Sequence, residues 1–183
     1  MKLIATPLNG VFEAETQPIA DVRGRFARLF CLKELAAAHG SRDIVQINYS
    51  MTRDVGAIRG LHYQRPPQAE GKWIRCLSGK VFDVAVDLRR GSATFLKWHA
   101  VELDGERMNA VFIPEGCAHG FQVLEANSEL LYLHTMAYEA SAEAAVRWDE
   151  PRVGVTWPLP ATTISDRDRS HAPLDPSFEG IEP

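Results

Sequence analysis

A two-residue alternation of side-chain character over positions 80–89 constrains the fold of this chain more than any other feature. Apolar residues at positions 82, 84, 86 and 88 alternate there with a second set that includes Asp83 and Asp87. Successive side chains of a strand point to opposite faces, so Lys80–Arg89 is predicted to be a strand with two different faces. One face belongs to the core. The face with two carboxylates is typical of a solvated surface or of the polar lining of a barrel.

Short segments of the same kind recur along the chain, separated by turn-forming pairs such as Ser78-Gly79 and Asp104-Gly105. This spacing is typical of an antiparallel sandwich or barrel. One helix, Leu32–His39, is predicted to end at Gly40, a common C-terminal cap. The remaining strands are predicted at Ile44–Ser50, Lys72–Leu77, Phe95–Leu103, Asn109–Ile113, Gly120–Leu124 and Leu130–Met136.

The size and composition of the chain indicate one packed domain over residues 1–183. Hydrophobic residues make up 45% of the sequence and charged residues 24%, as in a globular protein. From about residue 158 onward the sequence is rich in Pro, Asp, Arg and Ser, and we predict an ordered tail packed on the domain. No apolar run is long enough to cross a bilayer, and the start lacks a secretion signal, so a cytoplasmic protein without a membrane partner is expected.

The charge and the cysteines exclude two further classes. A formal net charge of -4 argues against a nucleic-acid surface that acts through bulk positive potential, so an anionic ligand must be met by a local basic cluster. Cys31, Cys76 and Cys117 are few, odd in number and far apart, which indicates no disulfide framework and agrees with a reducing compartment.

Two segments, Gly56–Gln64 and Pro114–His119, carry an unusual density of reactive groups. They resemble the two signatures of cupin barrels. Metal-binding cupins supply His-x-His from the first signature, whereas here Gln64 takes the second place, and an amide binds transition metals poorly. His62 and His119 alone leave most of a coordination sphere unfilled, so no metal is expected and His62 is free to act as an acid or base.

The similarity to one family is closer and extends in order over nearly the whole chain. The chain resembles the dTDP-4-dehydrorhamnose 3,5-epimerases and related 3- or 5-epimerases of nucleotide sugars. The residues that carry the resemblance are Asp21–Phe26, Gln46–Ser50, Arg59–Gln64, Lys72, Asp83–Arg89, Ile113–Phe121, Tyr132, Tyr138, Trp148–Pro151 and Ser165–Asp168.

The resemblance implies an all-β, cupin-type jelly-roll barrel with a few short peripheral helices, working as a homodimer without a cofactor. His62 would be the general base, Asp168 its orienting carboxylate, Lys72 the stabiliser of the enolate oxygen and Tyr132 the acid on the other face. These residue types suit the chemistry. Removing a proton next to a ketone at neutral pH needs a base that works near pH 7 and a stabilised enolate oxygen.

The resemblance also implies a set of substrate-binding residues. Arginines would bind the diphosphate through charge-assisted hydrogen bonds, aromatic rings would stack on the base, and polar side chains would direct the sugar. The arginines are Arg23, Arg59 and Arg167. The aromatic residues are Phe26 and Tyr138, and the polar residues that would direct the sugar are Gln46, Asn48 and His119.

Each of these residues also has a purely structural interpretation. Tyr132 lies in an apolar stretch and would ordinarily anchor a core. Lys72 resembles a solvated strand end, and Asp168 lies in a charge run that is usually an exposed face. Asp83 is an alternative carboxylate partner for His62. Four histidines that match no motif are assigned to surface or structural roles: His39, His99, His134 and His171.

The chain departs from the family pattern at four positions. Arg28 stands where a glutamate near the base is usual, which suggests a nucleotide other than thymidine, such as CDP or GDP. Leu133 replaces a lysine, and Met136-Ala137 replaces an acidic and aromatic pair. We expect these losses to thin the polar lining of the pocket and to favour reaction at one carbon.

We therefore predict an isomerase that epimerises C3, C5 or both in a nucleoside-diphosphate 4-keto-6-deoxy sugar. Two other functions fit the same barrel. A 3,4-ketoisomerase would move the carbonyl and not invert carbon, and a non-catalytic sugar-binding protein would exchange no proton with solvent.

Overall fold

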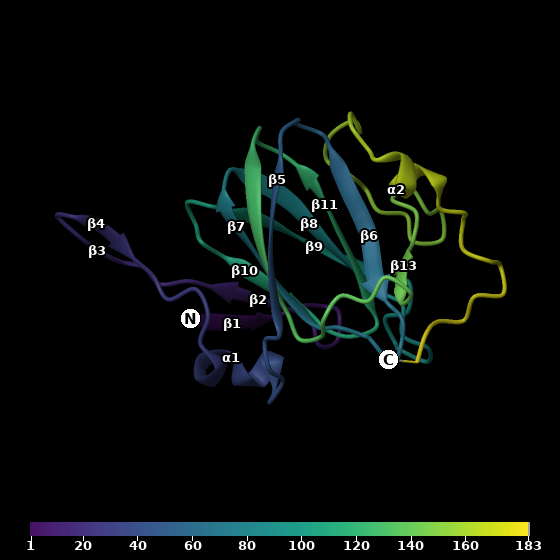
Figure 1. Ribbon diagram of the computed structural model, residues 1–183, viewed down its shortest axis with the longest axis horizontal. Coiled ribbons are helices and arrows are strands. Elements are labelled where there is room, and N and C mark those ends of the chain that lie inside the picture. Colours follow the sequence, from purple (N-terminus) through teal and green to yellow (C-terminus); the bar gives the residue numbers. More distant parts are fainter. Residues whose placement is uncertain (183) are drawn as a thin grey trace.

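Two antiparallel sheets face each other across a shared core in the computed structural model, which describes residues 1–182 (Figure 1). Apolar residues of both sheets, among them Ile74, Leu130, Val81 and Phe121, form one cluster between the sheets. The predicted cupin-type jelly-roll barrel is thus confirmed. No helix in the described part of the chain is long and apolar enough to span a membrane.

In both sheets the order of the strands in space, from one edge to the other, differs from their order along the chain. The six-stranded sheet contains β1 (Lys2–Ala5), β2 (Phe12–Glu15), β10 (Ala110–Ile113), β7 (Lys72–Ser78), β12 (Ser128–His134) and β5 (Gln46–Thr52). The five-stranded sheet contains β13 (Glu143–Ala145), β6 (Ile58–Gln64), β11 (Cys117–Val123), β8 (Lys80–Asp87) and β9 (Trp98–Asp104). A separate hairpin and two helices complete the fold: β3 (Ile19–Asp21), β4 (Gly24–Phe26), α1 (Leu32–His39) and α2 (Asp166–Ser170).

Most predicted elements occur with shifted ends. Helix α1 has the predicted bounds, and Gly40 caps it with φ +66°. Strand β9 begins at Trp98 and not at Phe95, because turn hydrogen bonds such as Lys97 N–H to Thr94 O close the chain before it. Strand β11 begins at Cys117, three residues earlier than predicted, so the second cupin signature enters the barrel wall. The predictions omitted β1–β4, β6, β13 and α2.

Strand β8 has the two predicted faces, and both are buried. Val84 and its even-numbered neighbours pack outside the barrel against the C-terminal tail, in one cluster with Trp157 and Phe178. The other face lines the barrel, where Asp83 is 1% exposed and Asp87 0% exposed. The polar-lining interpretation of these carboxylates is therefore correct, and the solvated-surface interpretation is wrong.

The tail from about residue 158 runs along the outside of the five-stranded sheet and brings α2 beside β6 (Figure 1). Ile58 N–H donates to Thr163 O at 2.9 Å, and the Ser165 hydroxyl caps α2 by accepting from Asp168 N–H at 3.1 Å. The acidic side chain of α2 that points inward is Asp168, which is 3% exposed. The exposed-face interpretation of this charge run is wrong for Asp168, because the tail folds over the barrel.

The β3–β4 hairpin projects away from the barrel (Figure 1). All six of its strand residues are exposed, including Ile19 and Phe26, each at 72%. Arg25 ties the hairpin to the body through an ion pair with Glu106. A projecting hairpin that carries large apolar side chains leaves hydrophobic area in water, which commonly marks a contact surface.

Candidate active site

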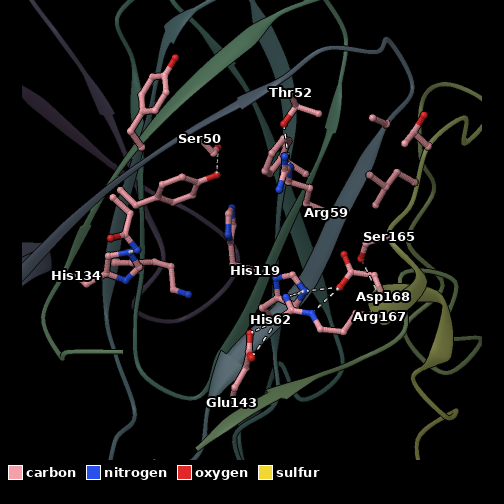
Figure 2. A pocket seen from close by; sticks show the side chains of 18 residues that line it. Ser50, Thr52, Arg59, His62, His119, His134, Glu143, Ser165, Arg167 and Asp168 are labelled. Atoms are coloured by element: carbon pink, nitrogen blue, oxygen red, sulfur yellow. Dashed lines mark hydrogen bonds and ion pairs between the residues drawn. The ribbon is translucent and has the colours of Figure 1, made fainter. Parts of the chain in front are cut away.

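A cavity of about 620 Å³ opens between the two sheets, within the range of small-molecule sites (Figure 2). Strands β5, β7 and β12 form one wall, and β6, β11 and α2 form the other. The cavity brings together many of the predicted site residues: Asn48, Arg59, His62, Lys72, His119, Tyr132, Arg167 and Asp168.

His62 and Asp168 form a close pair on the β6 wall. His62 Nε2 lies 2.7 Å from Asp168 Oδ1, and Gly60 N–H donates to Asp168 Oδ2 at 3.3 Å. Burial by itself would raise the pKa of Asp168, but the hydrogen bond and charge of His62, with help from Gly60 and Arg167, lower it. Since neutral imidazole has one donor and one acceptor nitrogen, donation from Nε2 leaves Nδ1 as the basic atom.

Gly60 permits the close contact of β6 and β11 that positions this pair. Its φ is +125°, and a Cβ there would lie 2.5 Å from Gly120 Cα and 2.8 Å from His119 O. Any larger residue would force the strands apart and move His62, two residues further along, away from its cross-strand neighbour His119.

His119 has a carboxylate partner of its own. His119 Nε2 lies 2.8 Å from Asp83 Oδ2, and the side chains are 7% and 1% exposed. Asp83 was the alternative partner for His62, and that prediction is wrong: β8 directs Asp83 to His119, while the tail supplies Asp168 to His62.

Tyr132 reaches the cavity from β12, on the sheet opposite His62. Its ring meets the His119 ring edge-on at a centroid distance of 6.2 Å, and its hydroxyl lies 3.0 Å from Ser50 Oγ. Burial raises the pKa of the phenol well above its usual value. Tyr132 therefore stays protonated at neutral pH and is suited to donate a proton.

A second ionic cluster, not recognised in the sequence, surrounds Lys72 at the start of β7. Lys72 Nζ lies 2.6 Å from Glu70 Oε1, and His134 Nδ1 lies 2.6 Å from Glu70 Oε2. His134 was predicted to have a surface or structural role, but its side chain lines the cavity. The available signal was its spacing, because residues two apart on a strand share a face and His134 follows Tyr132.

The mouth of the cavity carries two of the predicted diphosphate ligands, Arg59 and Arg167. Arg59 Nε donates to Thr52 Oγ1 at 2.9 Å, and Arg167 Nη1 lies 3.0 Å from Glu143 Oε1. Figure 2 shows Arg167 beside His62, with Nη2 3.3 Å from Nε2. No role was predicted for nine further lining residues: Tyr49, Ser50, Thr52, Ala57, Ile58, Phe121, Glu143, Thr163 and Ser165.

Gln46 and Tyr138 lie next to the cavity and do not line it. Gln46 Oε1 accepts from Tyr138 N–H at 3.0 Å, and Gln46 Nε2 donates to Asn48 Oδ1 at 3.1 Å. The exposed Tyr138 hydroxyl donates to Glu143. These two predicted binding residues therefore contact lining residues.

Three predicted binding residues lie outside the cavity. Arg23 is in the hairpin turn and pairs with Asp21, Phe26 is at the end of β4, and Arg28 pairs with Glu34. The expectation that they line the same pocket as His62 is wrong within one chain, because the hairpin projects away from the barrel (Figure 1).

The departures at Leu133 and at Met136-Ala137 do not thin the cavity lining. Leu133 packs on the opposite face of β12, in the cluster that contains Leu35 and Ala38 of α1. Met136 and Ala137 follow the end of β12, outside the lining. The expected loss of polarity is wrong, because side-chain alternation turns position 133 away from Tyr132.

Gln64 serves a structural purpose. Its amide donates to Gln68 O and Ala137 O and accepts from Glu139 N–H, which ties two loops together. Within residues 1–182, no group of three or more His, Cys, Asp or Glu side chains is arranged to hold a metal ion.

Comparisons with known proteins find one family and several similar structures. The family model described as dTDP-4-dehydrorhamnose 3,5-epimerase matches residues 5–176. The chain is 40% identical to a dTDP-4-dehydrorhamnose 3,5-epimerase of Shigella flexneri over 92% of this chain and 93% of that one.

Two solved structures are also similar. One is the Legionella pneumophila epimerase RmlC in complex with dTDP-4-keto-L-rhamnose, with TM-score 0.91, 34% identity and coverage of 100% of this chain and 98% of that one. The other is ChmJ, a 3'-monoepimerase from Streptomyces bikiniensis in complex with dTDP-quinovose, with TM-score 0.84, 33% identity and coverage of 92% and 85%.

Proposed function

The chain belongs to the dTDP-4-dehydrorhamnose 3,5-epimerase family, and from this premise we propose how its own residues carry out the reaction. It is an isomerase that epimerises a nucleotide-linked 4-keto-6-deoxy sugar by proton abstraction and return. The observation that carries the proposal is a cavity with an imidazole–carboxylate pair on one wall and a tyrosine phenol on the other.

His62 removes the proton from the carbon next to the ketone. Asp168 holds Nε2–H, so the lone pair on Nδ1 accepts the proton, and the imidazolium that forms is stabilised by the adjacent carboxylate. The C–H electron pair moves onto the C4 oxygen as the enolate forms. Lys72 is the cation that stabilises this oxygen, because it lines the opposite wall and carries ammonium protons beyond the one that meets Glu70.

Tyr132 returns a proton to the other face of the same carbon. The enolate collapses to the ketone, the carbon takes the phenolic proton, and its configuration is inverted. His62 then holds one extra proton and Tyr132 lacks one, so exchange with water restores both groups. Carbon keeps its oxidation level, and the reaction consumes no electrons.

Arg59 and Arg167 bind the diphosphate at the cavity mouth. Both guanidinium groups line the cavity, and both can offer paired N–H donors to phosphate oxygens. Arg167 pairs with Glu143 in the free protein, so diphosphate binding would exchange one anionic partner for another.

The homodimer would bring Arg23, Phe26 and Arg28 to a pocket. The hairpin carries exposed apolar residues, and β5 with the residue before it presents a second row at the sheet edge beside the cavity: Val45, Ile47, Tyr49 and Met51. Seating one protomer's hairpin over its partner's cavity would cover both surfaces and place an aromatic ring and two arginines at the mouth.

Product analysis in deuterated water tests the proposed reaction. The protein is incubated with dTDP-, CDP-, UDP- and GDP-4-keto-6-deoxyhexoses, and NMR follows deuterium at C3 and C5 and the configuration of each carbon. We expect deuterium and inversion with the wild type and at least about a hundredfold slower exchange with His62→Ala. Carbonyl migration would show a ketoisomerase, and no exchange would show a non-catalytic binder.

The same nucleotide panel tests the role of Arg28. Selective turnover of a CDP or GDP sugar would support the hypothesis that Arg28 marks a nucleotide other than thymidine. Selective turnover of the dTDP sugar would reject it.

Sedimentation of the wild type and of Phe26→Ser tests the dimer, because loss of the exposed ring should shift the protein toward monomer.

A further inference from the structure

Glu70 and His134 have no part in the proposed proton transfers, yet they form a continuous polar network with Lys72. Their side chains are 9% and 10% exposed. Glu70 precedes β7, whereas His134 ends β12 and is the cross-strand neighbour of Lys72. A buried carboxylate that bridges a lysine and a histidine is costly unless its oxygens are hydrogen-bonded, and here both are.

The direction of the hydrogen bonds along this network is fixed from its outer end. Tyr138 N–H can only donate, so Gln46 accepts through Oε1 and donates through Nε2. Asn48 then accepts through Oδ1, and its Nδ2 faces His134 Nε2 at 3.3 Å as a donor. His134 Nε2 must therefore accept, which requires a neutral ring with its proton on Nδ1.

The inner end of the network meets this requirement. His134 Nδ1–H points to Glu70 Oε2 at 2.6 Å, and the other oxygen of Glu70 meets Lys72. Burial would raise the pKa of Glu70, but the hydrogen bond from His134 and the charge of Lys72 lower it below its usual value. Glu70 is thus ionised at neutral pH and anchors the ammonium group.

We propose that Glu70 and His134 are positioning residues for Lys72: neutral His134 orients Glu70, and Glu70 holds the Lys72 ammonium against the cavity wall where the enolate oxygen forms. This inference rests on the proposed function of Lys72. Protonation of His134 would put an N–H against the Asn48 N–H, and turning the two amides to relieve that contact would leave Tyr138 N–H without its acceptor.

The groups that face His134 come from both sheets. Glu70 and Lys72 lie at the β7 end, and the Tyr132 ring stacks on His134 at 6.1 Å between centroids. The imidazoles of His119 and His62 line the far side of the cavity. His62 must also be neutral to accept a proton, so the enzyme requires two neutral imidazoles for different reasons.

Charge and hydrogen bonding can be separated with three variants. Glu70→Gln keeps the shape and removes the charge, His134→Leu removes the donor, and His134→Asn keeps an amide donor near the place of Nδ1. With the sugar nucleotide that the wild type turns over, we expect kcat to fall about tenfold or more in the first two variants, with KM nearly unchanged. His134→Asn should retain most of kcat, and Glu102→Gln, an exposed change on β9, is the matched control.

The pH profile provides a readout that a purely structural role would not move. On the acid side, log(kcat/KM) of the wild type should fall toward a limiting slope of about two, because two imidazoles must be neutral. His134→Asn should reduce that slope to about one.

The positioning role is overturned if the wild type is active and Glu70→Gln has an unimpaired kcat, or if the acid-side slope of log(kcat/KM) is unchanged in His134→Asn. Either result leaves the proposed function intact. A wild type without solvent exchange into any sugar overturns both. Thermal unfolding of each variant shows whether a lost rate reflects a lost fold.

Discussion

His62–Asp168 and His119–Asp83 are two imidazole–carboxylate pairs on neighbouring strands, and their environments differ. The Nε2-to-carboxylate distances are 2.7 and 2.8 Å. The His62 side chain is 28% exposed to the cavity, whereas that of His119 is 7% exposed and its carboxylate is sealed inside the barrel. Both histidines line the cavity, so the degree of exposure, and not the pair itself, distinguishes His62 as the candidate base from His119, which can offer substrate a single hydrogen bond.

The largest expected effect separates the two histidines directly. We expect His62→Ala to slow solvent deuterium exchange into substrate by at least about a hundredfold, because the base is lost. His119→Ala should slow exchange by roughly tenfold or less, since one hydrogen bond to substrate is worth about that much. NMR of the exchanging C–H measures both.

His99→Ala is the control for that experiment. His99 pairs with Glu13 at 2.8 Å on β9, away from the cavity lining, and its loss should leave the exchange rate near that of the wild type. Equal defects in the His62 and His119 variants would contradict the distinction between the two pairs.

The phenol opposite His62 provides the next largest effect. Tyr132→Phe should still allow His62 to remove the proton and exchange it with solvent, but inversion should fall by about a hundredfold because no acid remains on the other face. NMR would then show deuterium with retained configuration. Loss of exchange and inversion in equal measure would indicate that Tyr132 acts before or during abstraction.

Neutralising Asp168 should mainly lower kcat, whereas neutralising Asp83 should mainly lower the stability of the fold. Asp168→Asn is expected to lower kcat on the order of tenfold to a hundredfold by releasing the ring tautomer of His62. Asp83→Asn should chiefly destabilise the fold, by about 1–3 kcal/mol, because its partner is left poorly bonded inside the barrel. Urea unfolding and kcat are measured on both variants. A stable but inactive Asp83→Asn would contradict this contrast.

A smaller effect concerns stability against pH. The folded-state pKa of Asp168 is lowered below 3.8, so its interaction with His62 stabilises the protein above about pH 4 and is lost as the pH falls through the folded value. The free-energy difference between wild type and Asp168→Asn should therefore shrink from pH 6 to pH 3. Urea titrations at several pH values measure it, and a constant difference would rule out this linkage.

The smallest expected effect is at the mouth. Arg167 and Glu143 form an exposed ion pair beside His62, and Glu143→Gln should change the free energy of unfolding by less than about 1 kcal/mol. The change should diminish further in high salt. A larger, salt-insensitive loss would show that the mouth is as rigid as the buried pair at His119.

The sequence indicated much of the fold through local chemistry. Alternation identified β8, the cap at Gly40 fixed the end of α1, and the apolar strands β7 and β12 were located within two residues. The short strands β1 and β2, at one side of the six-stranded sheet, were missed, because four residues carry too little periodicity to stand out.

Chemistry-bearing residues such as His62, Lys72, Tyr132 and Asp168 could be selected from the sequence because their types and order resemble one family. The neighbours of those residues could not. Asp168 contacts His62, which is 106 positions away in the sequence, and Asp83 contacts His119 and not His62. Leu133 points away from the cavity. Residue order and alternation determine which side chains share a strand face, but closure of the sheets and packing of the tail decide which faces meet, since those contacts join segments that are remote along the chain.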